Sequence, residues 1–146
     1  MTTQLYEDMF LVQDKDPEGK RFDKVSRLVC QSVSMDTKLF LDVNTDIYPV
    51  EDGQRLQVML ASTLNLDGTP MDESFDPAVL VRPTLADKFE YVMHGRIFKC
   101  VEDKSAARVI SVFISFGGLM MMLKGDVRTL AGLELDHRVF LLVRRT

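Results

Sequence analysis

The chain has 146 residues, of which 46% are hydrophobic and 27% are charged, and its net charge is −4. These values are ordinary for one globular domain with its own core, so we expect a single domain over residues 1–146. The acidic balance argues against a free-standing nucleic-acid-binding protein, because the affinity of such proteins comes mostly from Lys and Arg side chains that neutralise phosphates.

The first part of the chain predicts four short strands, at residues 5–12, 25–33, 38–48 and 55–61. Alternation is clearest in the third strand. Its inward positions are Leu39, Leu41, Val43 and Ile47, and its outward positions are Lys38, Asp42, Asn44 and Asp46. Charged segments at 14–19 and 51–53 contain Gly, and the first also contains Pro, which is typical of turns between strands.

The alternating pattern fails over residues 62–88, which contain several prolines and an Asp-Gly pair. An irregular segment of this length is uncommon inside a compact domain and usually forms a functional or Ω-type loop. Thr84 and Asp87 have the spacing of a helix capping box, so we expect one helical turn to begin there.

Residues 109–125 form the most informative stretch of the chain. Its first half alternates, with Val112, Ile114 and Phe116 among the residues on one face and Phe113 between two serines on the other. Gly117 and Gly118 then supply the positive φ angles that a two-residue hairpin turn requires. The second half, residues 119–123, is apolar on both faces, so we predict a β-hairpin through the middle of the core. A membrane span is a poor alternative, because a span needs about 20 apolar residues without such a glycine pair.

Two further strands complete the pattern, at residues 89–101 and 138–145, and residues 126–137 form a connection that can hold a helical turn. Gly95 within the first of these strands marks a bulge or a close approach of another backbone. About eight short strands with hardly any helix predict an antiparallel barrel or sandwich.

Motifs for metal binding and catalysis are weak. Asp42, Asn44 and Asp46 match the start of a calcium-binding EF-hand loop, but Ile47 and Gly53 occupy its turn-glycine and closing-glutamate positions. Cys30, Cys100 and the two histidines lack the paired spacing of a zinc site, and two cysteines are too few for a disulfide framework. We find no nucleophile or phosphate-binding motif, and therefore expect no metal, no cofactor and no catalytic residue.

The apolar excess of the central hairpin indicates a protein partner. Met121 must face away from its two methionine neighbours, so one face of the strand exposes apolar surface unless both faces are covered. The competing interpretation is a core on both sides of the hairpin. The candidate interface residues are Tyr91, Met93, Gly95, Phe113, Ser115, Gly117, Gly118, Leu119 and Met121.

An alternative function is the binding of single-stranded nucleic acid, because small barrels can stack bases on aromatic side chains. Tyr91, Phe98 and Phe113 are the candidates for such stacking. The acidic net charge makes direct contact with nucleic acid doubtful.

Seven segments resemble, in order and at the right spacing, the eighth subunit shared by the three nuclear RNA polymerases of eukaryotes. They are LYEDMF (5–10), FDKVSR (22–27), LDVNTDIYP (41–49), LNLDGTP (64–70), LADKFEYVMHG (85–95), SFGGLMMMLKG (115–125) and FLLVRR (140–145). The resemblance covers nearly the whole chain.

This resemblance implies an eight-stranded antiparallel barrel of OB-fold type with a long Ω loop before the fifth strand. It also implies a non-catalytic structural subunit of RNA polymerases I, II and III that docks mainly on the largest subunit and contacts other core subunits. Its location would be the nucleus, including the nucleolus. The polymerase active site and its metals would belong to other chains.

Overall fold

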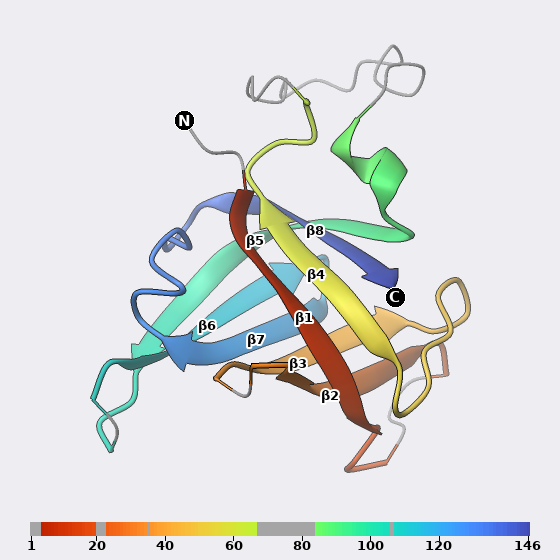
Figure 1. Ribbon diagram of the computed structural model, residues 1–146, viewed down its shortest axis with the longest axis horizontal. Coiled ribbons are helices and arrows are strands. Elements are labelled where there is room, and N and C mark those ends of the chain that lie inside the picture. Colours follow the sequence, from red (N-terminus) through yellow and green to blue (C-terminus); the bar gives the residue numbers. More distant parts are fainter. Residues whose placement is uncertain (1–3, 20–22, 35, 67–83, 106) are drawn as a thin grey trace.

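The computed structural model describes residues 4–19, 23–34, 36–66, 84–105 and 107–146. These residues form a closed barrel of eight antiparallel strands (Figure 1). The strands are β1 (Gln4–Lys15), β2 (Val25–Ser32), β3 (Lys38–Asn44), β4 (Arg55–Ala61), β5 (Tyr91–Glu102), β6 (Val109–Phe116), β7 (Leu119–Asp126) and β8 (Arg138–Arg145). The predicted all-β barrel is confirmed and is consistent with the OB-fold type, whereas the middle of the predicted loop, residues 67–83, lies outside the described residues.

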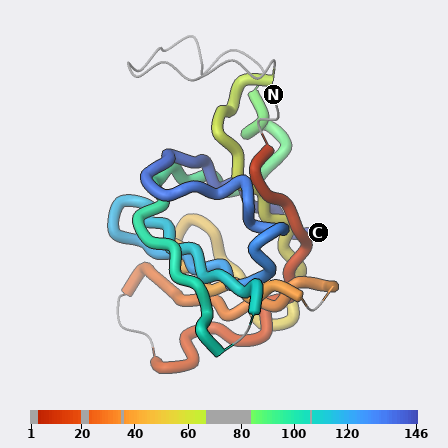
Figure 2. The backbone as a smooth tube through the Cα atoms, turned by 90° about the vertical axis from the view of Figure 1, so that its left-hand side faces the viewer, coloured from red at the N-terminus to blue at the C-terminus, as the bar shows by residue number. Residues whose placement is uncertain are grey.

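The strands follow one another around the barrel in the order β1, β2, β3, β7, β6, β5, β8 and β4, and β4 pairs with β1 to close it. Figure 2 shows the same closed path from the side. The pairs β3–β7, β4–β8, β5–β8 and β1–β4 join strands that are not consecutive in the chain. Because each strand is paired on both sides, the barrel wall leaves no free edge strand among the described residues.

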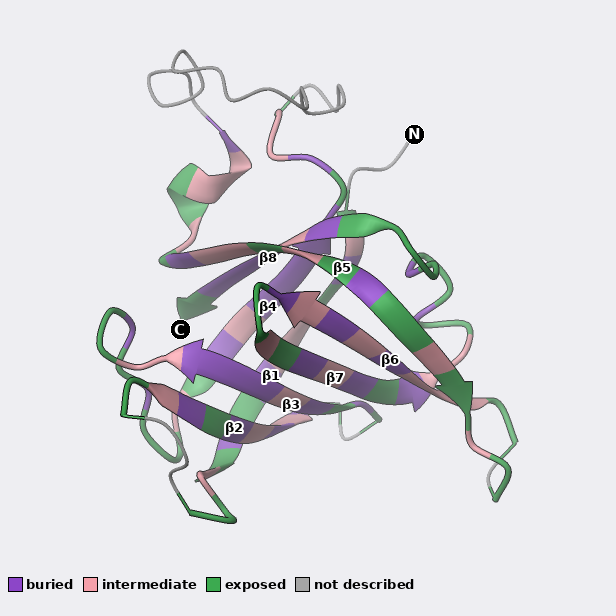
Figure 3. Ribbon diagram, turned by 180° about the vertical axis from the view of Figure 1, so that it is seen from behind, coloured by how far each residue is buried: buried purple, intermediate pink, exposed green. Residues whose placement is uncertain are grey.

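Side chains from all the strands fill the barrel, since successive residues of a strand point to opposite faces of the wall. The largest of these fully buried side chains are Phe10, Leu28, Leu39, Leu41, Leu56, Leu60, Ile97, Ile114, Met121, Leu123 and Leu141. Burial of each such side chain stabilises the fold by about 1.5–3 kcal/mol. The alternation of buried with less buried positions is visible along β6 and β7 in Figure 3.

The central hairpin forms as predicted. Gly117 and Gly118 have φ angles of 62° and 102°, which suit a primed two-residue turn between β6 and β7. Val112, Ile114 and Phe116 are buried on the inner face, and Phe113 lies on the outer face. Met121 is 1% exposed and therefore faces the interior, whereas Met120 is 37% exposed.

Gly95 lies where β5 closely approaches β6. A Cβ atom on this residue would lie 2.2 Å from the carbonyl oxygen of Ser115 and 2.5 Å from the ring of Phe116. The predicted close approach is confirmed, and the register irregularity between β5 and β6 lies further on, between Ile97 and Lys99. Only glycine fits at position 95 without displacing the backbone of β6.

A second apolar cluster covers the outer face of the barrel at β4 and β8. Met59, Ala61 and Leu142 are buried there, against partly buried residues that include Leu64 and Phe89. The short 3₁₀ helix η2 (Leu85–Lys88) belongs to this cover, and the amide of Leu85 donates to the Leu64 carbonyl at 2.8 Å. Figure 2 shows residues 62–66 beside residues 84–88 at one end of the barrel. The continuous apolar run at residues 139–143 of β8 fits a strand that is covered on both faces in this way.

The predicted helical turn at Thr84 and Asp87 is confirmed, because the Thr84 amide donates to the Asp87 carboxylate at 2.9 Å and η2 follows. A turn also occurs in the connection between β7 and β8. There the amide of Leu130 donates to the carbonyl of Asp126 at 3.1 Å, and Leu130 and Leu133 are buried in the barrel core.

The prediction for the end of β3 was wrong. The strand ends at Asn44 rather than at Tyr48, and Ile47, expected to face inward, is 71% exposed. The reason is a local turn, in which the Asn44 carbonyl accepts the Tyr48 amide at 3.0 Å and the Asn44 side chain accepts the Asp46 amide at 3.1 Å. These bonds compete with continuation of the strand and bring Tyr48 into the core.

Tyr48 connects this turn to the last strand through Glu90. The Tyr48 hydroxyl donates to the Glu90 carboxylate at 2.7 Å, and the backbone amide of Arg145 donates to the same oxygen at 2.7 Å. The Tyr48 ring stacks on Tyr91 and lies under the Arg145 guanidinium. The Arg145 amide, followed by the Tyr48 hydroxyl, lowers the pKa of Glu90 below its ordinary value.

We expect Gly95→Ala to lower the free energy of unfolding by about 1–3 kcal/mol, because the added methyl group overlaps the β6 backbone. Urea unfolding followed by circular dichroism measures this loss. Ser111→Ala, on the outer face of β6, is the control and should unfold at nearly the wild-type urea concentration. A wild-type midpoint for the Gly95 variant would contradict the close approach.

Glu90 also predicts a pH dependence. Because its pKa is lowered in the folded state, its contribution to stability is complete above its unfolded pKa of about 4.3 and is lost as the pH falls through the folded pKa. Urea unfolding between about pH 7 and pH 2.5 should therefore show a shallower acid loss of stability for Glu90→Gln than for wild type. Glu7→Gln is the control on β1. Equal slopes for wild type and Glu90→Gln would rule out the linkage.

Candidate partner interface

An apolar row crosses the outer face of three neighbouring strands. Phe113 of β6 pairs with Met122 of β7, and Met122 pairs with Phe40 of β3. We call Phe113, Met122 and Phe40 the outer-face row. Val112, Ile114, Leu123 and their neighbours point into the barrel interior. Because side chains alternate along each strand, Phe113, Met122 and Phe40 point outward.

The three side chains of the outer-face row are intermediate in burial, and exposed apolar side chains lie next to them. Phe98 of β5 is 43% exposed, and its ring centre lies 6.2 Å from that of Phe113. A hollow of about 250 Å³ over β7 is lined by Arg27, Phe40, Phe113, Met120, Met121 and Met122. Exposed aromatic and methionine side chains gathered on one face are typical of protein-binding surfaces.

Two lysines lie over the aromatic rings of this face. The Lys38 Nζ atom is 5.3 Å from the ring centre of Phe40, and the Lys99 Nζ atom is 5.4 Å from that of Phe113. Each contact is a cation–π interaction worth about 0.5–1 kcal/mol at an exposed site.

Arg27 and Asp42 form an ion pair beside the row. The Arg27 Nε and Nη2 atoms donate to the two Asp42 carboxylate oxygens at 2.7 and 3.1 Å. The hydrogen bond to Asp42 raises the pKa of Arg27. Asp42 is only 7% exposed, and such a bidentate contact compensates part of the cost of removing its charge from water.

The same carboxylate holds the central hairpin against β3. Backbone pairing between β3 and β7 runs from Lys38 with Lys124 to Leu41 with Met121. One residue further, the amide of Met120 donates to the Asp42 carboxylate at 3.0 Å. The side chain of Asp42 therefore continues the connection between the strands beyond the last backbone pair.

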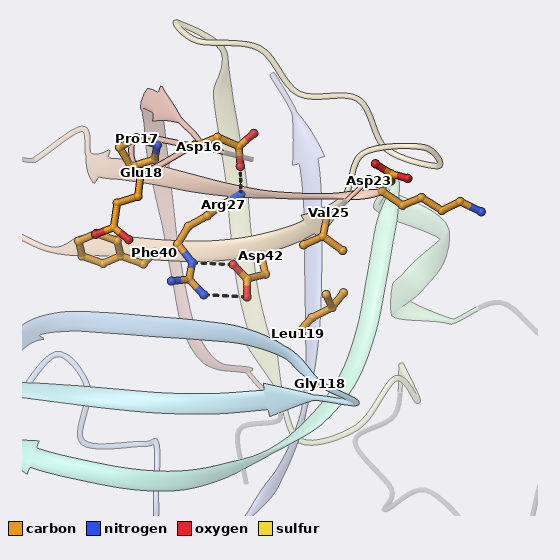
Figure 4. A pocket seen from close by; sticks show the side chains of 12 residues that line it. Asp16, Pro17, Glu18, Asp23, Val25, Arg27, Phe40, Asp42, Gly118 and Leu119 are labelled. Carbon is orange, nitrogen blue, oxygen red and sulfur yellow. Dashed lines mark hydrogen bonds and ion pairs between the residues drawn. The ribbon is translucent and has the colours of Figure 1, made fainter. Parts of the chain in front are cut away.

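A pocket of about 500 Å³ is lined in part by this ion pair and lies between the β1–β2 loop and the β6–β7 turn. Figure 4 shows Arg27 and Asp42 in it, with Asp16 above them and Leu119 below. Its lining residues are Asp16, Pro17, Glu18, Gly19, Asp23, Lys24, Val25, Arg27, Phe40, Asp42, Gly118 and Leu119. We call this the loop pocket. Asp16 supports its rim, because the Asp16 carboxylate accepts the backbone amide of Arg27 at 2.9 Å.

Comparison with known proteins identifies the family of this chain. Residues 7–145 match the family model described as RNA polymerase Rpb8. The chain belongs to the RNA polymerase Rpb8 family.

Three relatives of this Rpb8 family member align over nearly their whole length. The chain is 48% identical to the Dictyostelium discoideum protein "DNA-directed RNA polymerases I, II, and III subunit rpabc3", over 99% of each chain. It is 44% identical to "DNA-directed RNA polymerases II, IV and V subunit 8B" of Arabidopsis thaliana, over 97% of this chain and 95% of the relative. It is 38% identical to the Saccharomyces cerevisiae protein "DNA-directed RNA polymerases I, II, and III subunit RPABC3", over 99% and 100%. The resemblance seen in the sequence is thereby confirmed.

The structure separates the sequence-predicted interface residues of this Rpb8 chain into two groups. Phe113, Ser115 and Leu119 of the hairpin are intermediate in burial, and the turn glycines 117 and 118 are exposed. In contrast, Tyr91 and Met121 are buried in the core. Met93 packs against the core, and Gly95 packs against β6. Leu119 also packs against the core, so Phe113, Ser115 and the turn glycines are the outward residues of the hairpin.

Of the aromatic residues considered for base stacking, Phe98 and Phe113 lie together on the outer face, whereas Tyr91 is buried. The Tyr91 hydroxyl accepts the backbone amide of Asn44 at 3.2 Å and lies 3.2 Å from the Met93 sulfur. Burial raises the pKa of Tyr91. Tyr91 therefore belongs to the core of the barrel and not to its outer face.

Sequence reasoning missed Arg27, Phe40 and Met122 as members of this face. The alternation of β3 placed Asp42 outward but gave no indication of its burial. That burial depends on the hairpin turn, which lies about 75 residues away along the chain and contacts β3 only in the folded barrel. The pairing of three strands is likewise needed before Phe40, Met122 and Phe113 become neighbours.

The described residues contain no group of three or more His, Cys, Asp or Glu side chains placed to hold a metal ion. The thiols of Cys30 and Cys100 are free, and burial raises the pKa of Cys30 to about 12. No helix in the described part of the chain has the length and apolar character needed to cross a membrane.

We expect Asp42→Ala to lower the free energy of unfolding by about 1–3 kcal/mol, because it removes hydrogen bonds to a charged acceptor. Asp42→Asn should cost less, since its amide oxygen can still accept the Met120 amide. Urea unfolding measures both losses, and amide hydrogen exchange should show faster exchange at Met120 in the alanine variant. Unchanged exchange at Met120 would contradict the role of this carboxylate in holding the hairpin.

Proposed function

We propose that this chain is a non-catalytic structural subunit shared by the nuclear DNA-directed RNA polymerases I, II and III, and that it docks on the largest polymerase subunit through the outer-face row. Membership in the Rpb8 family supports the assignment to a polymerase. The Dictyostelium and yeast relatives are named as subunits of polymerases I, II and III, and the plant relative as a subunit of II, IV and V. A shared role is therefore common to these relatives, although the set of enzymes differs.

The observation that carries the docking proposal is the apolar row Phe113, Met122 and Phe40, extended by Met120 and Phe98. A closed barrel cannot bind a partner by adding a strand to an edge, so its side chains must provide the contact. Apolar and aromatic side chains form the buried centre of stable interfaces, and charged side chains lie at their rims. The row with its flanking lysines has this arrangement.

The proposed role is structural because the groups on this face act by packing and by charge pairing. Asp42 is bound by Arg27 and by a backbone amide, so its carboxylate supports the fold. We infer that catalysis belongs to other chains of the polymerase, and that other core subunits also contact this chain.

Assembly into nuclear polymerases places the chain in the nucleus. As a subunit of polymerase I, the chain would also lie in the nucleolus. Binding of single-stranded nucleic acid to Phe98 and Phe113 is disfavoured, because a net charge of −4 repels phosphates.

Affinity purification tests the docking surface. We expect Phe113→Asp, expressed with a tag in cells, to recover the largest polymerase subunit at least about tenfold less well than wild type, because a charge at the centre of an apolar interface costs at least ~2 kcal/mol. Quantitative mass spectrometry of the purified subunits gives the yield.

Ile47→Asp is the matched control, since Ile47 is an exposed apolar residue in the turn after β3. It should recover the polymerase at the wild-type level, and circular dichroism should show both variants folded. Wild-type recovery with a folded Phe113→Asp variant would mean that the row is not the interface. Recovery of no polymerase subunit by the wild-type chain would contradict the proposed function itself.

A further inference from the structure

We propose that the partner segment on the outer-face row is acidic as well as apolar, and that its carboxylates pair with Lys38 and Lys99 at the two ends of the row. This inference rests on the proposed function, because it takes the segment to belong to the largest polymerase subunit. The chemistry of the segment follows from the two lysines and from the charges around them.

The two lysines lie over the two end rings of the row. The Lys38 Nζ atom is 5.3 Å from the ring centre of Phe40. The Lys99 Nζ atom is 5.4 Å from that of Phe113. Both rings belong to residues that pair with Met122 of the strand between them, and Figure 3 shows β3, β7 and β6 side by side. Since neighbouring strands are about 4.8 Å apart, the two cations are on the order of 10 Å apart across the sheet.

The outward position of Lys99 depends on a register irregularity in β5. Ile97 is fully buried and pairs with Ile114, whereas Lys99 pairs with Phe113 on the outer face. Phe98 is the extra residue between them, and both Phe98 and Lys99 are exposed. In a regular strand these two neighbours would point to opposite faces, and an irregularity of this kind changes the direction of a side chain. The barrel therefore places a ring and a cation together at this end of the row.

Lys38 and Lys99 differ from other basic side chains of the same wall, because they lack a carboxylate partner. Three basic residues on β2, β7 and β5 form the ion pairs Arg27–Asp42, Lys124–Asp103 and Arg96–Asp136. Lys38 and Lys99 form no ion pair with any carboxylate of the described residues. Lys38 also lies directly opposite Lys124 in the β3–β7 ladder, which is unfavourable for like charges. The row is thus bordered by two unmatched cations, although the whole chain has a net charge of −4.

The carboxylates for these two lysines are expected from another chain. Residues 20–22, 35 and 106, which complete three of the connections between strands, include one lysine and one arginine but no Asp or Glu. Leu64 and Leu85, on either side of residues 67–83, belong to the cover over β4 and β8. Neither of those strands pairs with β3 or β6 in the barrel.

Docking on the row removes both cations from water. A partner that packs on the rings of Phe40 and Phe113 also lies against the Nζ atoms of the lysines over them. A charge that loses its water without a counter-charge is costly, whereas a carboxylate compensates it. A purely apolar segment is therefore disfavoured, and a segment with apolar residues between two carboxylates is favoured.

A protein segment suits the row better than the phosphates of a nucleic acid. Met122 lies in the middle of the row, and Val29 of β2 pairs with Phe40 beyond its end, so aliphatic side chains separate and flank the rings. Single strands bind to grooves that are basic along their whole length, with aromatic rings for successive bases. The net charge of −4 also repels a polyanion.

Carbodiimide cross-linking tests the pairing directly, because it joins a lysine amine to a neighbouring carboxylate without a spacer. In polymerase purified through a tag on this chain, we expect Lys38 and Lys99 to be joined to Asp or Glu residues next to apolar residues of the largest subunit, as read by mass spectrometry. Lys88, exposed in η2, is the comparison and should not be joined to that segment. Absence of both cross-links, or cross-links only to carboxylates of this chain, would overturn the inference.

Charge reversal is the second test. We expect the double variant Lys38→Glu and Lys99→Glu, expressed as a tagged chain in cells, to recover the largest polymerase subunit at least about threefold less well than wild type. Lys38→Arg with Lys99→Arg keeps both charges and should recover it at the wild-type level. Lys88→Glu with Lys104→Glu, at two exposed positions away from the rings, is the matched control for total charge. Circular dichroism should show all these variants folded.

The outcomes separate this inference from the proposed function. Wild-type recovery by Lys38→Glu with Lys99→Glu would overturn the inference, whereas loss of recovery in Phe113→Asp would still support docking. An equal deficit for the arginine pair or for the control pair would also overturn it, since shape or total charge would then be the cause. Loss of the wild-type complex after nuclease treatment would indicate nucleic acid as the occupant and overturn it too. Failure of the wild-type chain to recover polymerase would overturn the function first.

Discussion

Closure of the barrel is the constraint on which the other features depend. Four strand pairs join strands that are not consecutive in the chain, and they close the sheet so that each of the eight strands is bonded on both sides. Closure makes one face of the wall the core and the other face surface. Closure also removes the free strand edges, so only outward side chains of this Rpb8 family member can contact a partner.

The outward face is divided into two regions with different roles. Over β4 and β8, residues such as Leu64, Leu85 and Phe89 of the same chain cover the wall and form a second apolar cluster. Over β3, β7 and β6, the apolar row borders two hollows. The first region stabilises the subunit, and the second is the one we assign to the polymerase partner.

Arg27 and Asp42 connect the stability of the barrel to the proposed interface. Asp42 binds Arg27 and the amide of Met120, and thereby fixes the hairpin turn against β3. Both side chains line the loop pocket, and Arg27 also lines the hollow over β7. A change at this pair is therefore expected to affect folding and docking together, whereas a change at Phe113 is expected to act on docking.

The sequence by itself determined the strands, the hairpin turn at Gly117 and Gly118, and the family, because alternation and turn chemistry are local and the family segments cover the chain. It failed at Ile47, where side-chain hydrogen bonds of Asn44 end the strand early. Only the tertiary structure decided that Met121 faces inward, that Asp42 is buried, and that Phe40 joins Phe113. These facts depend on which distant strands pair and in which register, and a shift of one residue would reverse every side chain.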